Sequence, residues 1–148
     1  MDDKRTAHVL LVEDNDDHAE LVTRQLAEHV SNARLTRVVD GQEALDYLFH
    51  HGRYSDPLEN PRPHVVFLDL RLPKVDGLEV IKIVKESEDL RKIPIVVLTT
   101  SESERDVTRA YVNHANSYVV KPVDFQKFRD LMNELGIYWL NWNTRVNS

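Results

Sequence analysis

The sequence of 148 residues contains no cysteine. This absence excludes a disulfide framework, a metal site built on thiolates and a cysteine nucleophile. The sequence also has no run of about 18 apolar residues, the length that a membrane-spanning helix needs, so we expect no membrane span. Its start, MDDKRTAHVLLVEDN, has a short apolar stretch with acids on both sides, unlike a signal peptide. These features favour a location in the cytoplasm.

Positive charge is in deficit, with 19 Lys and Arg residues against 25 Asp and Glu residues and a formal net charge of −6. This balance argues against a general nucleic-acid binder, because such proteins use Lys and Arg to neutralise phosphates. The content of 41% hydrophobic and 30% charged residues is typical of a globular protein. The length suits one domain with a substantial core. We therefore expect a single domain over residues 1–148, without nucleic-acid or membrane partners.

Short apolar runs alternate along the chain with segments of helical periodicity. The runs lack the polar–apolar alternation of a strand with one solvent-exposed face, which indicates strands that are covered on both faces. They therefore predict an α/β fold with a parallel sheet between two layers of helices. Expected strands cover residues 8–13, 34–39, 64–69, 93–99 and 117–121, and expected helices lie around residues 19–30, 44–49, 78–84, 106–114 and 125–135. Asn15 or Asp16 could cap the first helix, and Asp124 the last. The Pro-rich segment 50–63 is expected to be an exposed loop.

Polar residues follow or end four of the expected strands. In a parallel sheet, ligands bind beyond the carboxyl ends of the strands, and there the sequence places Glu13, Asp14, Asp69, Thr99 and Lys121. Three neighbouring acids repel one another unless a cation lies among them, and a hard ion such as Mg²⁺ prefers carboxylate oxygens. Thr99 and Lys121 suit an anion with several acceptor oxygens, such as a phosphoryl group. The pattern indicates phosphoryl transfer onto a carboxylate, with Asp69 as the nucleophile and the cations stabilising charge.

Each of these residues also has a purely structural interpretation. Asp69 could cap a turn or helix, and Glu13 with Asp14 could do the same at the first helix. Thr99 is a common strand residue, and Lys121 could be a surface charge. Their shared position, at the same end of separate strands, favours the functional interpretation.

The segments LLVEDN, VVFLDLRLPKVDGLEV, IPIVVLTTS and SYVVKPV occur in this order. They resemble the signatures of the receiver domain of two-component response regulators, the CheY-like family. The resemblance covers roughly residues 8–135 and implies a flavodoxin-like, doubly wound sheet of five parallel strands with helices on both faces. It further implies a protein that accepts a phosphoryl group from a histidine kinase and then switches its protein–protein contacts.

The resemblance also implies roles for the acidic residues. Asp69 matches the phosphoacceptor aspartate of the family. Asp14 matches a direct Mg²⁺ ligand, with Mn²⁺ as a substitute metal, and Glu13 matches an acid that acts mainly through water. Arg71 stands where the family offers a backbone carbonyl to the metal.

The other matched positions concern the phosphoryl group and the conformational switch. Lys121 matches the family's lysine at the phosphoryl site. Thr99 matches the switch hydroxyl and Tyr118 the switch aromatic. Pro122 stands where the family usually has a cis proline, although an X–Pro bond is cis only about 5% of the time in folded proteins.

A narrower resemblance rests on the long Pro-rich loop before the third strand and on the tail GIYWLNWN. Both resemble small stand-alone regulators paired with phytochrome-type histidine kinases, and so imply such a kinase as partner. The tail, residues 136–148, follows the expected core and leaves no room for a DNA-binding domain, so the output is expected to be protein contact. Aromatic residues are enriched in interfaces, so we predict a homodimer with Tyr138, Trp139 and Trp142 as contacts. The alternative is that the tail folds back over its own domain and covers the fourth helix.

Three other functions compete with the phosphoacceptor interpretation. A phosphohydrolase of the haloacid-dehalogenase type wants a second Asp two residues after the nucleophile, where this sequence has Arg71. A flavin-binding module holds phosphate in a Ser/Thr/Gly-rich first loop, whereas this loop reads EDNDDHAE. A pseudo-receiver used only for binding is disfavoured by the full set of site residues. We therefore expect a signalling protein with intrinsic autophosphorylation and autodephosphorylation chemistry, and not a turnover enzyme.

Overall fold

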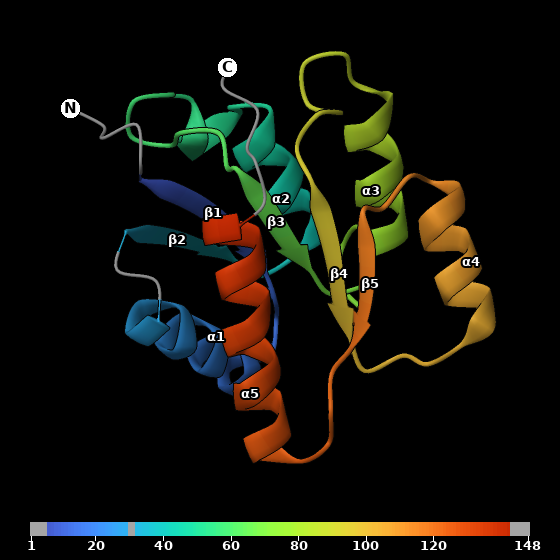
Figure 1. The fold of residues 1–148 in the computed structure, drawn as a ribbon. Helices are drawn as coiled ribbons and strands as arrows, with labels where there is room; N and C mark the ends of the chain where they lie inside the picture. The colour runs from blue at the N-terminus through green and yellow to red at the C-terminus, as the bar shows by residue number, and fades with distance from the viewer. Residues whose placement is uncertain (1–5, 30–31, 143–148) are drawn as a thin grey trace.

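Five parallel strands form one sheet in the order β2-β1-β3-β4-β5 (Figure 1). The structure is a computed structural model that describes residues 6–29 and 32–142. The strands are β1 (Ala7–Val12), β2 (Ala33–Val38), β3 (Val65–Leu68), β4 (Ile95–Thr99) and β5 (Ser117–Val120). All five predicted strands are confirmed, and each bound lies within two residues of its prediction.

The two faces of the sheet are covered by separate groups of helices (Figure 1). The helices are α1 (Asp16–His29), α2 (Gly41–Leu48), α3 (Gly77–Glu86), α4 (Glu104–Val112) and α5 (Phe125–Gly136), with a short 3₁₀ turn η1 (Gly52–Tyr54). Helices α1 and α5 share one core cluster with Val9 and Leu11 of β1, and α2 and α3 share the other with Leu10 and Val12. Alternate residues of one strand therefore enter opposite cores, which explains why the apolar runs show no polar alternation.

Short polar side chains cap the amino-terminal ends of the helices. Asn15 accepts a hydrogen bond from the His18 N–H at 3.1 Å, and Asp124 accepts one from the Lys127 N–H at 2.9 Å, as the sequence predicted. The remaining helices are capped in the same way by Asp40, Asp76 and Ser103. A cap of this kind contributes about 1 kcal/mol and determines where the loops above the sheet turn into helices. Within the described ranges, no helix is both long enough and apolar enough to cross a bilayer.

A close backbone approach requires a glycine where the loop after β3 turns into α3. The Gly77 N–H donates to the Leu70 carbonyl at 3.0 Å. A Cβ on Gly77 would lie 2.5 Å from the Asp69 carbonyl oxygen and 2.7 Å from Leu70 Cα, and backbone atoms cannot yield as a flexible side chain can. The absence of a side chain at Gly77 therefore lets α3 begin directly against the residues that follow β3.

The segment 50–63 is largely exposed, as predicted, but it carries a buried anchor. Tyr54 is buried, and its hydroxyl donates to Glu43 Oε2 at 2.7 Å. Its ring packs edge-on against Tyr47 of α2, with 5.2 Å between the ring centroids. Tyr54 thus helps to fix the loop to α2, and the Tyr47 hydroxyl adds a second contact by donating to the Pro61 carbonyl at 2.7 Å.

The chain continues from α5 into a π-helix, η2 (Ile137–Trp142), so Gly136 does not end the helix. Trp139 and Leu140 are buried in the core cluster that contains α1 and α5, whereas Tyr138 is 52% exposed. Trp139 therefore packs on its own domain, as the alternative expects, but it does so in the cluster of α1 and α5 and not against the fourth helix. Its role as a dimer contact stays a prediction. Burying an indole outweighs the cost of about 1 kcal/mol for a glycine inside a helix. The Trp142 side chain lies outside the described part of the structure.

Replacing Trp139 should therefore destabilise the isolated domain. We expect Trp139→Ala to lower the free energy of unfolding by about 3 kcal/mol, because it removes a large buried ring and leaves a cavity. Tyr138→Ala, at the neighbouring exposed position, is the control and should change it by about 0.5 kcal/mol or less. Urea denaturation of both variants measures the difference. Equal denaturation midpoints would show that the tail contributes nothing to the core.

Candidate functional site

The predicted polar residues do meet at the carboxyl edge of the sheet. Strand β1 pairs with β3 so that Val12 lies beside Leu68, and the next residues, Glu13 and Asp69, emerge together. The Lys121 N–H donates to the Thr99 carbonyl at 2.7 Å, which brings the end of β5 beside the end of β4. Three strands deliver the residue that follows them and β4 its last residue, Thr99, to one place, because parallel strands end at the same edge.

Three carboxylates form a compact acidic group at this edge. Glu13, Asp14 and Asp69 each offer an oxygen, and these oxygens lie within 4.8 Å of one another. Glu13 is buried, Asp69 is half-buried and Asp14 is exposed. Oxygen donors that are partly open to water suit a hard divalent cation, which keeps some of its own water ligands. The acidic group is therefore capable of binding a divalent metal.

A buried ammonium pairs with the Glu13 and Asp69 carboxylates of this group. Lys121 is 3% exposed, and its Nζ donates to Glu13 Oε1 at 2.5 Å and to Asp69 Oδ2 at 3.1 Å. The second oxygen of Glu13 accepts from the Asn15 N–H at 3.2 Å. Burial raises the pKa of Glu13, the Lys121 hydrogen bond opposes that rise, and the charge of Asp69 adds to it. Lys121 thus supplies the positive charge that allows two carboxylates to lie close together where little water reaches them.

His18 completes the surroundings of the ammonium, and the sequence analysis missed it. Its Nδ1 lies 2.9 Å from Lys121 Nζ, and its ring packs edge-on against Phe128 of α5. An ammonium only donates, so Nδ1 is the acceptor and the imidazole is neutral. Burial and the Lys121 charge lower the pKa of His18, in keeping with that state. The available signal was its position in the first turn of α1, which faces back toward the preceding acids.

Thr99 and Tyr118 approach each other through Ser101. Thr99 is fully buried, and its Oγ1 accepts a long hydrogen bond from the Ser101 N–H at 3.4 Å. The Tyr118 hydroxyl donates to the Ser101 carbonyl at 2.9 Å. Burial raises the pKa of Tyr118, so the phenol keeps its proton and remains a donor at neutral pH. Both predicted switch residues are thus connected to the loop after β4.

The side chain of Arg71 points to α4, to a residue that the sequence analysis missed. Its backbone N–H donates to Asp69 Oδ1 at 3.2 Å, and its Nη2 contacts Asp106 Oδ2 at 2.6 Å. Asp106 is 6% exposed and also accepts from Ser101 Oγ at 2.6 Å. A signal was present in the sequence: Asp106 lies four residues before Ala110, on the buried face of a short helix.

The peptide bond between Lys121 and Pro122 is trans, since no cis peptide bond occurs in the described residues. The prediction of a cis proline at Pro122 is therefore wrong for this structure. Trans is the lower-energy isomer of an X–Pro bond by about 0.5–1 kcal/mol. In this trans arrangement the Lys121 side chain already reaches both Glu13 and Asp69.

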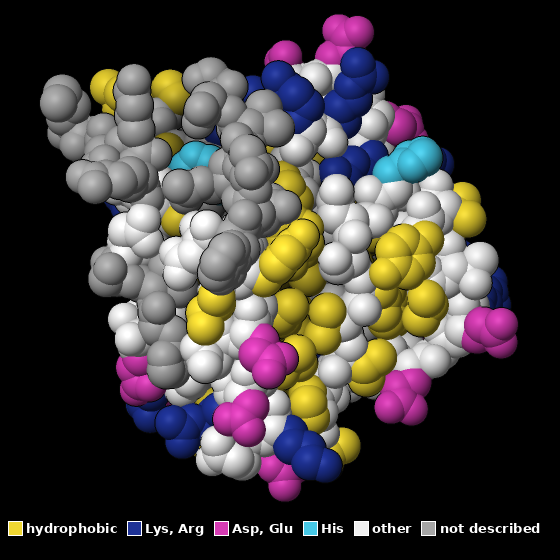
Figure 2. Space-filling model, viewed as in Figure 1, with side chains coloured by type: hydrophobic (Ala, Val, Ile, Leu, Met, Phe, Trp, Pro, Cys, Tyr) yellow, Lys and Arg dark blue, Asp and Glu magenta, His cyan; other side chains and the backbone are white. Residues whose placement is uncertain are grey.

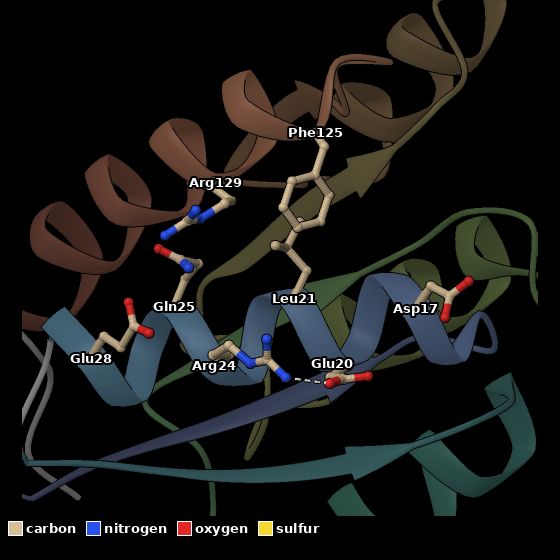
Figure 3. Close-up of a pocket in the computed structure, with 8 residues that line it drawn as sticks. All are labelled: Asp17, Glu20, Leu21, Arg24, Gln25, Glu28, Phe125 and Arg129. Carbon is tan, nitrogen blue, oxygen red and sulfur yellow. Dashed lines mark hydrogen bonds and ion pairs between the residues drawn. The ribbon is translucent and has the colours of Figure 1, made fainter.

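Grooves flank the site on the side of α1 and α5. One, of about 650 Å³, is lined by Lys121 together with Leu21, Val123 and Phe125. A second, of about 460 Å³, runs between α1 and α5, where Phe125 and Leu21 point toward each other and Arg24 pairs with Glu20 (Figure 3). Val123 is fully exposed and Phe125 is 65% exposed, so exposed apolar side chains share a groove with Lys121.

Comparison with known sequences gives consistent relatives. Residues 9–133 match the model of the response regulator receiver domain family. The probable methanogenesis regulatory protein FilR2 of Methanothrix harundinacea is 49% identical over 135 residues, 91% of this chain and 84% of that protein. Response regulator Rcp1 of Synechocystis sp. is 37% identical over 132 residues, 89% of this chain and 88% of that protein.

Solved structures agree with these relatives. The phosphorylated cyanobacterial phytochrome response regulator RcpA superposes with a TM-score of 0.91 at 34% identity, over 96% of this chain and 99% of that one. The Mn²⁺-bound form of Rcp1 superposes with a TM-score of 0.90 at 35% identity, over 95% of this chain and 99% of that one. The family match, the strand order and these superpositions agree, and the chain belongs to the response regulator receiver domain family of two-component signalling.

Proposed function

We propose that the protein accepts a phosphoryl group on Asp69 from a phosphohistidine of a sensor histidine kinase and then changes its contacts with other proteins. The observation that carries this proposal is the contact between Asp69 Oδ2 and the buried Lys121 ammonium, inside an acidic group at the open edge of the sheet. Asp69 has a side chain that is 12% exposed, so it is held in place and still reachable by a donor.

The geometry supports a simple transfer step. A carboxylate oxygen of Asp69 attacks phosphorus, the phosphorus–nitrogen bond breaks, and the imidazole of the donor leaves with the bonding electron pair. Because the second ring nitrogen of the phosphohistidine carries a proton during the step, the ring leaves as a neutral imidazole. The products are an acyl phosphate on Asp69 and a neutral histidine on the kinase. Lys121 donates to the reacting carboxylate before the step and is placed to donate to a phosphoryl oxygen after it.

The metal in this proposal is Mg²⁺, with Mn²⁺ as a substitute. Asp14 and Asp69 would hold it directly, Arg71 through its backbone carbonyl, and Glu13 through water, because both Glu13 oxygens already accept hydrogen bonds. When bound, a divalent cation neutralises charge on the transferred phosphoryl group. The solved Mn²⁺-bound form of Rcp1 supports a divalent cation in this proposal.

Thr99 and Tyr118 are proposed as the residues that convert the new charge into a structural change. A phosphoryl group on Asp69 would offer acceptor oxygens to the buried Thr99 hydroxyl, at the end of the adjacent strand. Movement of Thr99 would disturb Ser101, whose carbonyl holds the Tyr118 hydroxyl. A local charge event would in this way bias the position of the loop after β4.

The exposed apolar residues Val123 and Phe125 support a docking surface for the kinase beside Lys121. Aromatic and apolar side chains next to a reactive group are typical of the core of an interface. The similarity to RcpA and Rcp1 favours a phytochrome-type kinase, whereas FilR2 is named for methanogenesis. We therefore propose the histidine kinase class, with the phytochrome type as its first candidate. A single domain over residues 1–148 and a cytoplasmic location stay predictions.

Self-association stays a prediction as well. Tyr138 is exposed, and so are Tyr111 and Val112 of α4. Figure 2 shows hydrophobic side chains gathered over α4 and in the strip between α4 and α5. A symmetric dimer would bury such a surface on both subunits. Sedimentation over a concentration series, with a monomer at every concentration as the contrary result, decides the question.

The nucleophile is tested by intact-mass measurement after incubation with acetyl phosphate and Mg²⁺. The wild type should gain the mass of one phosphoryl group, and Asp69→Asn should gain none because it lacks a nucleophilic carboxylate. Asp89→Asn, which removes the same charge at an exposed turn away from the sheet edge, should behave like the wild type. Uptake by Asp69→Asn at the wild-type rate would mean that another residue is the acceptor.

The metal site is tested by thermal unfolding with and without millimolar Mg²⁺. The metal should raise the Tm of the wild type, because a ligand that binds only the folded state stabilises it. Asp14→Ala should remove this increase and should raise the Tm of the metal-free protein by relieving repulsion. A metal-dependent increase of equal size in Asp14→Ala would contradict the assignment.

The switch is tested with Thr99→Val, which keeps the shape of the side chain and removes its hydroxyl. Phosphoryl uptake should remain within about twofold of wild type, since Asp69 and Lys121 are intact. The change in hydrogen exchange that phosphorylation causes around Ser101 should be lost. If that change persists in the variant, the Thr99 hydroxyl does not carry the signal.

A further inference from the structure

One carboxylate oxygen ties together three segments near the proposed phosphorylation site. Asp106 Oδ2 accepts from Arg71 Nη2 and from Ser101 Oγ, both at 2.6 Å. Asp106 belongs to the first turn of α4, Arg71 to the loop after β3, and Ser101 to the loop after β4. A buried carboxylate needs such partners, because an unpaired charge is costly away from water.

The two partners of Asp106 flank the reacting residues. Arg71 follows Asp69 by two positions, and its N–H donates to Asp69 Oδ1 at 3.2 Å. Ser101 follows Thr99 by two positions, and its carbonyl accepts from the Tyr118 hydroxyl. Burial raises the pKa of Tyr118, the charges of Asp106 and Asp69 add to that rise, and the charge of Arg71 opposes it.

The ion pair between Arg71 and Asp106 is weak enough for Arg71 to exchange Asp106 for another anion. The Arg71 side chain is 64% exposed, whereas the Asp106 side chain is only 9% exposed. A largely solvated guanidinium gains little from one ion pair. A phosphoryl group on Asp69 would add negative charge and several acceptor oxygens close to the Arg71 backbone. Guanidinium groups bind such oxygens in a bidentate manner, so a second anion would compete for Arg71.

We propose that Asp106 is a positioning residue, which holds the Arg71 guanidinium on α4 while Asp69 is unmodified, and that Arg71 transfers to the phosphoryl group once Asp69 is phosphorylated. This inference rests on the proposed function. Its consequence is mechanical: without Arg71, Asp106 keeps Ser101 as its partner, and the first turn of α4 loses its connection to the loop after β3. Helix α4 then responds to the charge on Asp69 through a route separate from the Thr99 hydroxyl.

The test measures the rate of phosphoryl uptake from acetyl phosphate, with Mg²⁺, by intact mass. Asp106→Asn should raise the rate about two- to fivefold, the range that one exposed ion pair allows, because it frees Arg71 for the anionic donor. In an Arg71→Gln background the same Asp106→Asn change should have no effect. Glu104→Gln removes an equal charge from the same turn at an exposed position and should leave the rate unchanged.

Hydrogen exchange provides a second readout that does not depend on Asp106→Asn folding well. Beryllofluoride, a phosphoryl mimic, should speed amide exchange in the first turn of α4 of the wild type. Arg71→Gln should show this faster exchange without the mimic, and the mimic should add nothing further. Unchanged exchange in Arg71→Gln, or an Asp106→Asn effect that persists without Arg71, would overturn the proposal. If the wild type takes up the phosphoryl group and the variants do so at the same rate, this inference alone is refuted. If the wild type takes up no phosphoryl group, the proposed function is refuted too.

Discussion

The contact between the Lys121 ammonium and the carboxylates of Glu13 and Asp69 is the interaction on which the site depends. Two acids at a sheet edge would repel each other, and burial of Glu13 would favour its neutral form. A lysine from the end of β5 offsets both effects, because its charge is equally buried and reaches both acids. Removing Lys121 would leave uncompensated charge, which costs far more than the pair gains on its own.

This arrangement is possible because the sheet is parallel and its connections are covered by helices. Strands β1, β3 and β5 come from distant parts of the chain, yet they all end at the same edge. The tight start of α3 at Gly77 then holds the residues after Asp69 close to the sheet. The core supplies rigidity, and the loops above it supply the reactive groups.

The loops beyond β3 and β4 are connected to each other through α4. Arg71 and Ser101 meet on Asp106, and Tyr118 binds the Ser101 carbonyl. A change at Asp69 therefore has polar contacts through which it can reach the surface of α4 and β5. Such contacts are weak enough at exposed Arg71 to exchange, whereas the apolar core beneath them is not.

The sequence by itself determined the alternation of strands and helices, the parallel sheet, and the four strand ends where the site lies. Those features follow from hydrophobic periodicity and from the positions of Glu13, Asp14, Asp69, Thr99 and Lys121, which are local properties of the chain. Only the tertiary structure decided that His18 faces Lys121 and that Asp106 binds Arg71, because these partners are 103 and 35 residues apart. It also decided the trans bond before Pro122 and the burial of Trp139. An aromatic tail has the same sequence pattern whether it covers its own core or a partner. Periodicity shows which side of a helix is apolar, but the partner of a polar side chain depends on which elements the fold brings together.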